Sequence, residues 1–93
     1  FGAALAGIPI SSTKSSIGHL LGAAGGVEAV FSTLAVLRGV LPPTLNFGTA
    51  DDGAEDLDFI PLKARAKTLR SALCNSFGFG GVNASLCLRA LGA

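Results

Sequence analysis

An amine and a carboxylate in the first 28 residues are spaced so that they could form a charged pair in an apolar setting. Glu28 lies seven residues after Leu21 and three before Phe31, so on a helix it would share their apolar face. A carboxylate on a buried face is costly unless it is paired. Lys14 is the only cation nearby. These residues allow two interpretations: a buried Lys14–Glu28 pair, or a Glu28 at the edge of the face that reaches water.

His19 is the single histidine, and the pattern places it in the first turn of a helix expected from about Ile17 to Arg38. The positive end of a helix disfavours the imidazolium form, and a neutral ring can donate one hydrogen bond to a carbonyl. The alternative is a polar residue with no task. One histidine and two distant cysteines do not form a ligand set, so we expect no metal site.

A glycine-rich segment, Gly78-Phe79-Gly80-Gly81, could present several backbone N–H groups in one turn. Such turns can bind an anion or an oxyanion, although many are only the tips of hairpins. The segment lacks the Lys-Ser/Thr of a phosphate-binding P-loop, so nucleotide binding is not indicated.

Cys74 and Cys87 are candidates for a disulfide or a nucleophile. If Phe77 pairs with Val82 in a hairpin, the two thiols are diagonal and too far apart for easy bridging. Neither has a base nearby in sequence. We therefore expect both to be buried thiols of a reducing compartment.

The composition limits the classes of protein that remain. The chain has 93 residues, of which 49% are hydrophobic and 14% charged, with a net charge of +1. This is too apolar for a disordered chain and gives no electrostatic footprint for nucleic acid. Only Lys14 and Glu28 are charged in the first 37 residues. So little charge suggests a piece of a larger domain rather than a small domain by itself. Nothing near Phe1 resembles a signal peptide.

The first half of the chain predicts a strand at Ile8–Thr13 and then the helix, capped by Ser15 or Ser16. One helix face is bulky and the next is made of small residues, namely Gly18, Gly22, Gly25 or Gly26, and Ala29. A helix that is apolar all round is a buried one. Its length and GxxxG spacing also fit a membrane span, which Glu28, His19 and the pattern downstream oppose.

The second half predicts loops and a hairpin. Pro42 and Pro43 follow the helix, and the acidic stretch Gly48–Asp58 reads as a surface loop. Leu57–Pro61 is expected as a short strand. Residues 69–77 and 82–88 both alternate with period 2, which predicts an antiparallel hairpin with the glycine-rich segment at its tip.

Four motifs in order resemble the C-terminal half of β-ketoacyl-acyl carrier protein synthases, most closely synthase II of fatty-acid synthesis, including its mitochondrial form. They are Ser11-Ser12-Thr13-Lys14-Ser15, Gly18 to Gly25 followed by Val27-Glu28-Ala29, Leu41 to Asn46, and Asn75 to Asn83. The resemblance implies an α/β fold, the C-terminal portion of a thiolase-type αβαβα fold with a strand, a long buried helix and then an antiparallel hairpin. Residues 1–93 would be a fragment of this C-terminal domain, inactive alone because the nucleophile-bearing N-terminal domain is absent.

The resemblance also implies residue roles in a decarboxylative Claisen condensation of an acyl thioester with malonyl-acyl carrier protein. His19 matches a histidine that hydrogen-bonds the malonyl thioester and stabilises the enolate. Lys14 matches the active-site lysine, and Glu28 matches its carboxylate partner. Phe77 matches the gating phenylalanine, whose N–H serves as an oxyanion donor, and Gly78, Phe79, Gly80 and Gly81 match the gating loop.

The implied enzyme is an acyltransferase of fatty-acid biosynthesis that needs no metal or organic cofactor. Its partners would be acyl and malonyl forms of acyl carrier protein and a second copy in a homodimer, with no nucleic acid and no membrane. The expected location is intracellular and reducing, in a bacterial cytoplasm, a mitochondrial matrix or a plastid. The alternatives are a polyketide ketosynthase and a non-catalytic remnant or interaction module of the thiolase superfamily. A thiolase itself is disfavoured because the segment Asn75–Gly78 has no cysteine.

Overall fold

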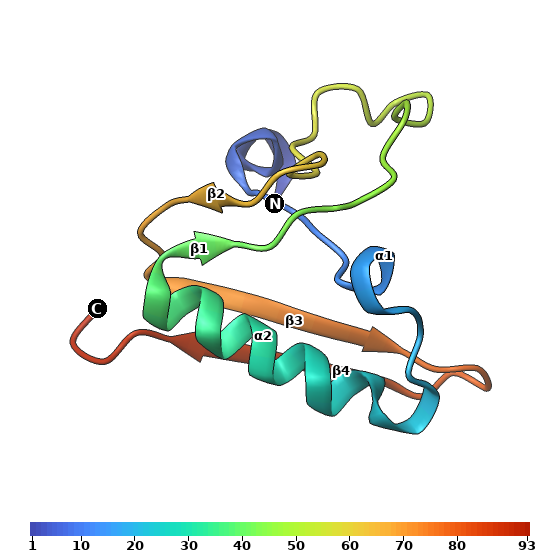
Figure 1. The fold of residues 1–93 in the computed structure, drawn as a ribbon, viewed down its shortest axis with the longest axis vertical. Helices are drawn as coiled ribbons and strands as arrows, with labels where there is room; N and C mark the ends of the chain where they lie inside the picture. Colours follow the sequence, from blue (N-terminus) through green and yellow to red (C-terminus); the bar gives the residue numbers. More distant parts are fainter. The chain divides into compact units, whose positions relative to one another are not determined.

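The computed structural model describes residues 1–93, which form two units. Phe1–Gly18 and Leu41–Arg65 form the first unit, and His19–Val40 and Ala66–Ala93 form the second. The elements in chain order are η1 (Gly2–Gly7), α1 (Lys14–Ile17), η2 (Leu21–Ala23), α2 (Ala24–Arg38), β1 (Val40–Leu41), β2 (Arg65–Ala66), β3 (Ser71–Phe77) and β4 (Asn83–Arg89) (Figure 1).

In the second unit, α2 lies along an antiparallel hairpin made of β3 and β4 (Figure 1). The predicted hairpin is therefore confirmed, but its register differs by one residue from the expected one. Phe77 pairs with Asn83 rather than with Val82. The Gly78 N–H donates to the Val82 carbonyl at 2.7 Å, which closes a tip that includes Val82.

The observed register places the two cysteines on opposite faces of the hairpin. Cys74 lies opposite Leu86, and Cys87 lies opposite Leu73. Because neighbouring residues of a strand point to opposite faces, the two thiols cannot be bridged. Both are free, as expected. Cys74 is buried but Cys87 is exposed, so the prediction of two buried thiols is wrong for Cys87, which lies on the face turned away from α2.

The helix predicted from Ile17 to Arg38 is interrupted near its start. The short helix α1 ends at Ile17, and the next residue, Gly18, has a φ of 80° and a ψ of −179° that turn the chain out of the helical path. The helix resumes through η2, and α2 begins at Ala24. Neither predicted cap is observed, because Ser15 and Ser16 both lie inside α1. The N-cap position belongs to Thr13, without a side-chain hydrogen bond.

The expected burial of this helix on all sides is not seen within these 93 residues. Only Ala24 and Ala35 are buried in α2, whereas Val30 and Leu37 are exposed. The physical reason is that one hairpin can cover only one side of a helix. Of the small residues, Gly25 meets a neighbour: a Cβ there would lie 3.5 Å from the Ser76 Oγ.

The stretch Leu21–Arg38 is long and apolar enough to cross a membrane, as judged by length and composition alone. The core helix of a soluble protein passes the same test. The observation therefore does not favour a membrane span over a core helix.

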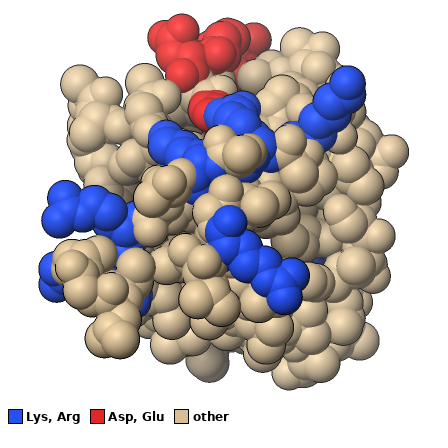
Figure 2. Space-filling model, turned by 60° about the vertical axis from the view of Figure 1, so that its left-hand side comes forward, with Lys and Arg blue, Asp and Glu red and all other residues tan.

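In the first unit, the two predicted strands are replaced by irregular chain. At Ile8–Thr13 there is no strand, and the Ile10 N–H donates to the Asp58 carbonyl at 2.8 Å. Pro9 lacks an N–H, which weakens any ladder there. Leu57–Pro61 forms only an isolated parallel bridge between Thr44 and Pro61. The acidic segment is mostly exposed turns, as predicted, and Figure 2 shows acidic side chains gathered in one place.

Replacing Gly39 with alanine should destabilise the end of α2. Gly39 has a φ of 64°, and a Cβ there would lie 3.4 Å from the Lys67 carbonyl oxygen. We expect a loss of about 1 kcal/mol in unfolding free energy, measured by urea denaturation.

Gly26→Ala is the matched control for this substitution. Gly26 has open space around its Cα and lies inside α2. Alanine there should add about 0.5–1 kcal/mol of stability. A loss at position 26 would instead indicate that another element packs closely on this face.

Candidate functional site

His19 lies in the connection between α1 and η2, with its ring exposed. The Leu21 N–H donates a hydrogen bond to the His19 Nδ1 at 2.9 Å. A ring nitrogen that accepts a hydrogen bond carries no proton, so in the neutral ring the proton is on Nε2. The structure therefore presents the Nε2–H of His19 as a hydrogen-bond donor.

The cause of this arrangement differs from the predicted one. His19 lies before η2 and not in the first turn of α2, so its predicted placement is wrong. Instead Leu20, with a φ of −88° and a ψ of 14°, turns the Leu21 N–H back toward the imidazole, and Leu21 itself then adopts a φ of 52°. A leucine at positive φ is uncommon, and no sequence pattern indicates it. The only signal was Gly18, a residue suited to ending a helix.

Phe77 is the last residue of β3, and the register determines where its backbone points. The Ala90 N–H donates to the Arg70 carbonyl, and the Gly78 N–H donates to the Val82 carbonyl. Hydrogen-bonded pairs alternate along an antiparallel ladder, so Phe77 and Asn83 form a non-hydrogen-bonded pair. The Phe77 N–H therefore points away from β4 and makes no hydrogen bond within the hairpin. An oxyanion donor must be free of the ladder in this way.

The glycines of the tip meet specific geometric demands. Gly80 and Gly81 have φ values of 86° and 84°, which residues other than glycine rarely adopt. At Gly78, a Cβ would lie 3.0 Å from the Val82 carbonyl oxygen, too close for an ordinary contact. Phe79 and Phe77 are both exposed. The segment is thus a turn that depends on glycine and presents two aromatic rings.

The second unit brings the histidine segment and the hairpin tip to the same end. Gly25, in the first turn of α2, lies against Ser76, which precedes Phe77. Figure 1 likewise shows η2 and the start of α2 beside the end of β3. His19 is only a few residues before η2, so two of the predicted site residues belong to one end of this unit.

Lys14 and Glu28 are both half-buried, in α1 and α2 respectively. They belong to different units, and neither is without an interaction partner. Glu28 is thus neither fully buried nor fully exposed. The Lys14–Glu28 pair stays a prediction.

The structure has no group of three or more His, Cys, Asp or Glu residues that could hold a metal ion. A polar network in the first unit, which sequence reasoning missed, is centred on Asp58 and Arg65. The hydrogen bond from Arg65 to Asp58 raises the pKa of the guanidinium above its ordinary value. A positive charge seven residues after an acidic one is too common a pattern to indicate such a pair from sequence.

Residues 1–48 match the family described as beta-ketoacyl synthase, C-terminal domain. The chain is 56% identical over 82 residues to 3-oxoacyl-[acyl-carrier-protein] synthase 2 of Rhizobium meliloti, covering 88% of the chain and 19% of the relative. It is 56% identical over 80 residues to a mitochondrial 3-oxoacyl-[acyl-carrier-protein] synthase of Arabidopsis thaliana, covering 85% and 17%.

A solved structure, described as a type II PKS acyl-carrier protein in complex with its ketosynthase bound to the hexaketide, matches with a TM-score of 0.83 at 39% identity. The match covers 90% of this chain and 20% of that one. The chain belongs to the β-ketoacyl synthase C-terminal domain family, and the expected thiolase-type fold class is confirmed. The chain spans about a fifth of the length of the relatives it matches.

Proposed function

We propose that this chain is the C-terminal part of a 3-oxoacyl-acyl carrier protein synthase of fatty-acid synthesis. The observation that supports this most directly is the His19 tautomer. The Leu21 N–H occupies Nδ1, so the ring offers a hydrogen-bond donor at Nε2. A neutral donor is what the enolate of a decarboxylating malonyl thioester requires.

In the proposed reaction, the malonyl carboxylate leaves as carbon dioxide, and its bonding electrons move into the thioester to form an enolate. The Nε2–H of His19 donates to the thioester oxygen and stabilises the developing charge. The enolate carbon then attacks the acyl thioester held on a cysteine elsewhere in the enzyme. The carbon–sulfur bond breaks, and a 3-oxoacyl product remains on the carrier.

Phe77 and the tip of the hairpin supply the other proposed roles. The Phe77 N–H points away from the ladder and can donate to the oxyanion of the attacked acyl group. The exposed ring of Phe77 would separate the acyl and malonyl pockets. The glycines at 78, 80 and 81 would let it move, since they tolerate a wide range of φ.

The proposed partners are acyl carrier protein in its acyl and malonyl forms and a second copy of the enzyme. Acyl carrier protein is supported by the names of the relatives and by the solved ketosynthase complex. A bacterial cytoplasm, a mitochondrial matrix or a plastid fits relatives that include a bacterial and a mitochondrial enzyme.

The test uses the full-length protein with malonyl-acyl carrier protein and a panel of acyl thioesters. We expect release of carbon dioxide and formation of a 3-oxoacyl-carrier product in equal amounts, detected by mass spectrometry. Repeated extension without reduction would favour the polyketide ketosynthase, which the solved neighbour also suggests. No acyl transfer and no decarboxylation would indicate a non-catalytic member of the family.

A further inference from the structure

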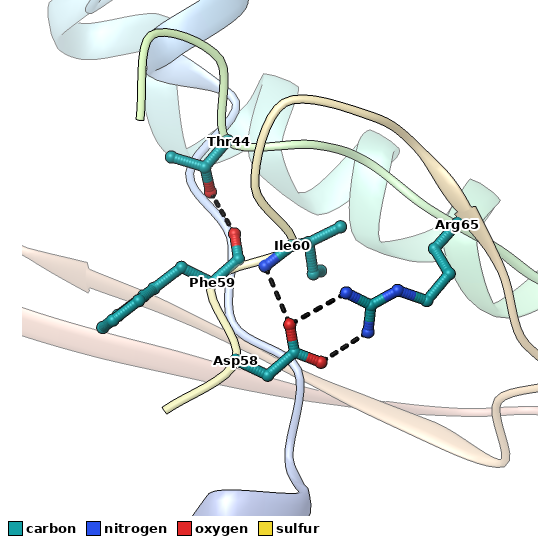
Figure 3. A network of polar contacts seen from close by, with 5 residues as sticks. All are labelled: Thr44, Asp58, Phe59, Ile60 and Arg65. Atoms are coloured by element: carbon teal, nitrogen blue, oxygen red, sulfur yellow. Dashed lines mark hydrogen bonds and ion pairs between the residues drawn. The ribbon is translucent and has the colours of Figure 1, made fainter. Parts of the chain in front are cut away.

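In the first unit, the Asp58 carboxylate joins Arg65 to the backbone of its own loop (Figure 3). The Asp58 carboxylate accepts two hydrogen bonds from Arg65, Nη1 to Oδ2 at 2.5 Å and Nη2 to Oδ1 at 3.0 Å. Its Oδ1 also accepts from the Ile60 N–H at 3.0 Å. The Asp58 carbonyl accepts from the Ile10 N–H. Side chain and backbone of this residue therefore hold both its own loop and the segment before α1.

The loop held by Asp58 has an uncommon backbone. Ile60 has a φ of 50° and Leu62 a φ of 68°, values that are unfavourable for residues with large side chains, above all for a β-branched isoleucine. Ile60 is nonetheless the most buried residue of the core, with 2% of its surface exposed. Such conformations persist only where surrounding contacts enforce them, and they are often found near functional sites.

From this loop, a continuous set of hydrogen bonds extends to the next segment. The Thr44 N–H donates to the Ile60 carbonyl at 2.9 Å, and the Leu62 N–H donates to the Thr44 carbonyl at 2.9 Å. The Thr44 hydroxyl donates to the Phe59 carbonyl at 2.6 Å, as Figure 3 shows. Thr44 is therefore held on both sides by the strained loop.

The residue after Thr44 links this network to α1. The Leu45 N–H donates to the Ser15 Oγ at 2.8 Å, and the Ser15 hydroxyl donates to the Ser12 carbonyl at 2.9 Å. Ser15 follows Lys14 directly, inside α1. Lys14 thus lies between two attachments to the 41–65 segment, one at Ile10 and one at Ser15.

We propose that Asp58 and Arg65 are positioning residues that hold Lys14 in place through Thr44, Leu45 and Ser15. The proposal rests on the proposed function and on the active-site role that the family resemblance implies for Lys14. Most exposed ion pairs contribute little. This pair is bidentate, and it shares its carboxylate with the N–H of a residue at positive φ. Its loss should therefore change the geometry of the loop and not only a surface charge.

The test measures amide hydrogen exchange in the full-length protein carrying Asp58→Ala. We expect the amides of Leu45 and of residues 16–18 to exchange at least about tenfold faster, while those of β3 and β4 stay unchanged. Asp56→Asn is the matched control, because it removes an exposed charge from the same loop. It should leave both sets of amides unchanged. Faster exchange confined to residues 57–66 would overturn the proposal.

Two further variants keep the proposal testable if Asp58→Ala fails to fold. Arg65→Lys keeps the charge but not the two-pronged contact, and it should give a smaller change at the same amides. Ser15→Ala should accelerate exchange at Leu45 without affecting residues 57–62. If Arg65→Lys leaves Leu45 and residues 16–18 unchanged, the network does not hold α1.

Comparing malonyl decarboxylation with acyl loading gives a second measurement, because a purely structural role of Asp58 would not affect one step more than the other. Asp58→Ala should lower malonyl decarboxylation several-fold while loading of the acyl group onto the nucleophile continues. Equal losses in both steps would contradict positioning of Lys14. Because exchange is measured without substrate, a shift at residues 16–18 would support the physical link even if no condensation were found. In that case the proposed function would fail separately.

Discussion

In the full-length enzyme, His19→Ala is expected to lower malonyl decarboxylation by about 100- to 1,000-fold, the usual cost of removing one oxyanion donor. The reason is the Nε2–H, which the bond from Leu21 to Nδ1 leaves as the donor. Transfer of the acyl group to the nucleophile should continue, because that step does not form the malonyl enolate. Release of carbon dioxide from labelled malonyl-acyl carrier protein measures the first step. Mass spectrometry of the acylated enzyme measures the second.

His19→Gln is the matched control for this experiment. A glutamine amide can donate from about the position of Nε2, so this variant should recover part of the lost rate. Recovery by glutamine but not by alanine would identify the donor as the essential feature. Decarboxylation at close to the wild-type rate in His19→Ala would show that the assigned role is wrong.

Lys14→Met is expected to reduce both activity and stability. Lys14 and Glu28 are half-buried, and removing the amine would leave the carboxylate without the partner that the sequence predicts. An unpaired polar group that is shielded from water costs about 1–3 kcal/mol. Chemical denaturation should therefore show a lower midpoint, together with a large loss of decarboxylation.

The double variant Lys14→Met with Glu28→Gln separates the two effects. If the residues form a pair, removing the second charge should restore much of the stability lost with the first, a coupling that a double-mutant cycle measures. The activity should stay low. An unchanged midpoint in Lys14→Met would mean that Glu28 is solvated and the pair is not formed.

The sequence predicted those elements that depend on local pattern. The period-2 alternation predicted the hairpin that β3 and β4 form, because the side chains of a strand alternate between its two faces. It could not give the register, which the Gly78–Val82 hydrogen bond decides. The motifs around Lys14 and His19 identified the family, which the match over residues 1–48 confirms.

The predicted start of the long helix was wrong, because the spacing of apolar residues carries no information on backbone angles. Gly18 and Leu21, both at positive φ, interrupt a pattern that otherwise continues from Ile17. Within this interruption the Leu21 N–H meets the His19 ring, an arrangement on which the role proposed for His19 depends. By helix propensity Leu21 is an ordinary helix residue, so the sequence does not indicate the turn there.

By itself, the sequence determined the types of the reactive groups and their order along the chain, because these are covalent facts. It also determined the low charge of the first third. Only the tertiary structure decided which proton His19 presents, where the Phe77 N–H points and how Asp58 connects to Ser15. These features depend on hydrogen bonds that join residues as near as Leu21 and His19 and as far apart as Ile10 and Asp58, 48 positions away. Bonds of that kind form only when the chain folds, and no local pattern specifies them.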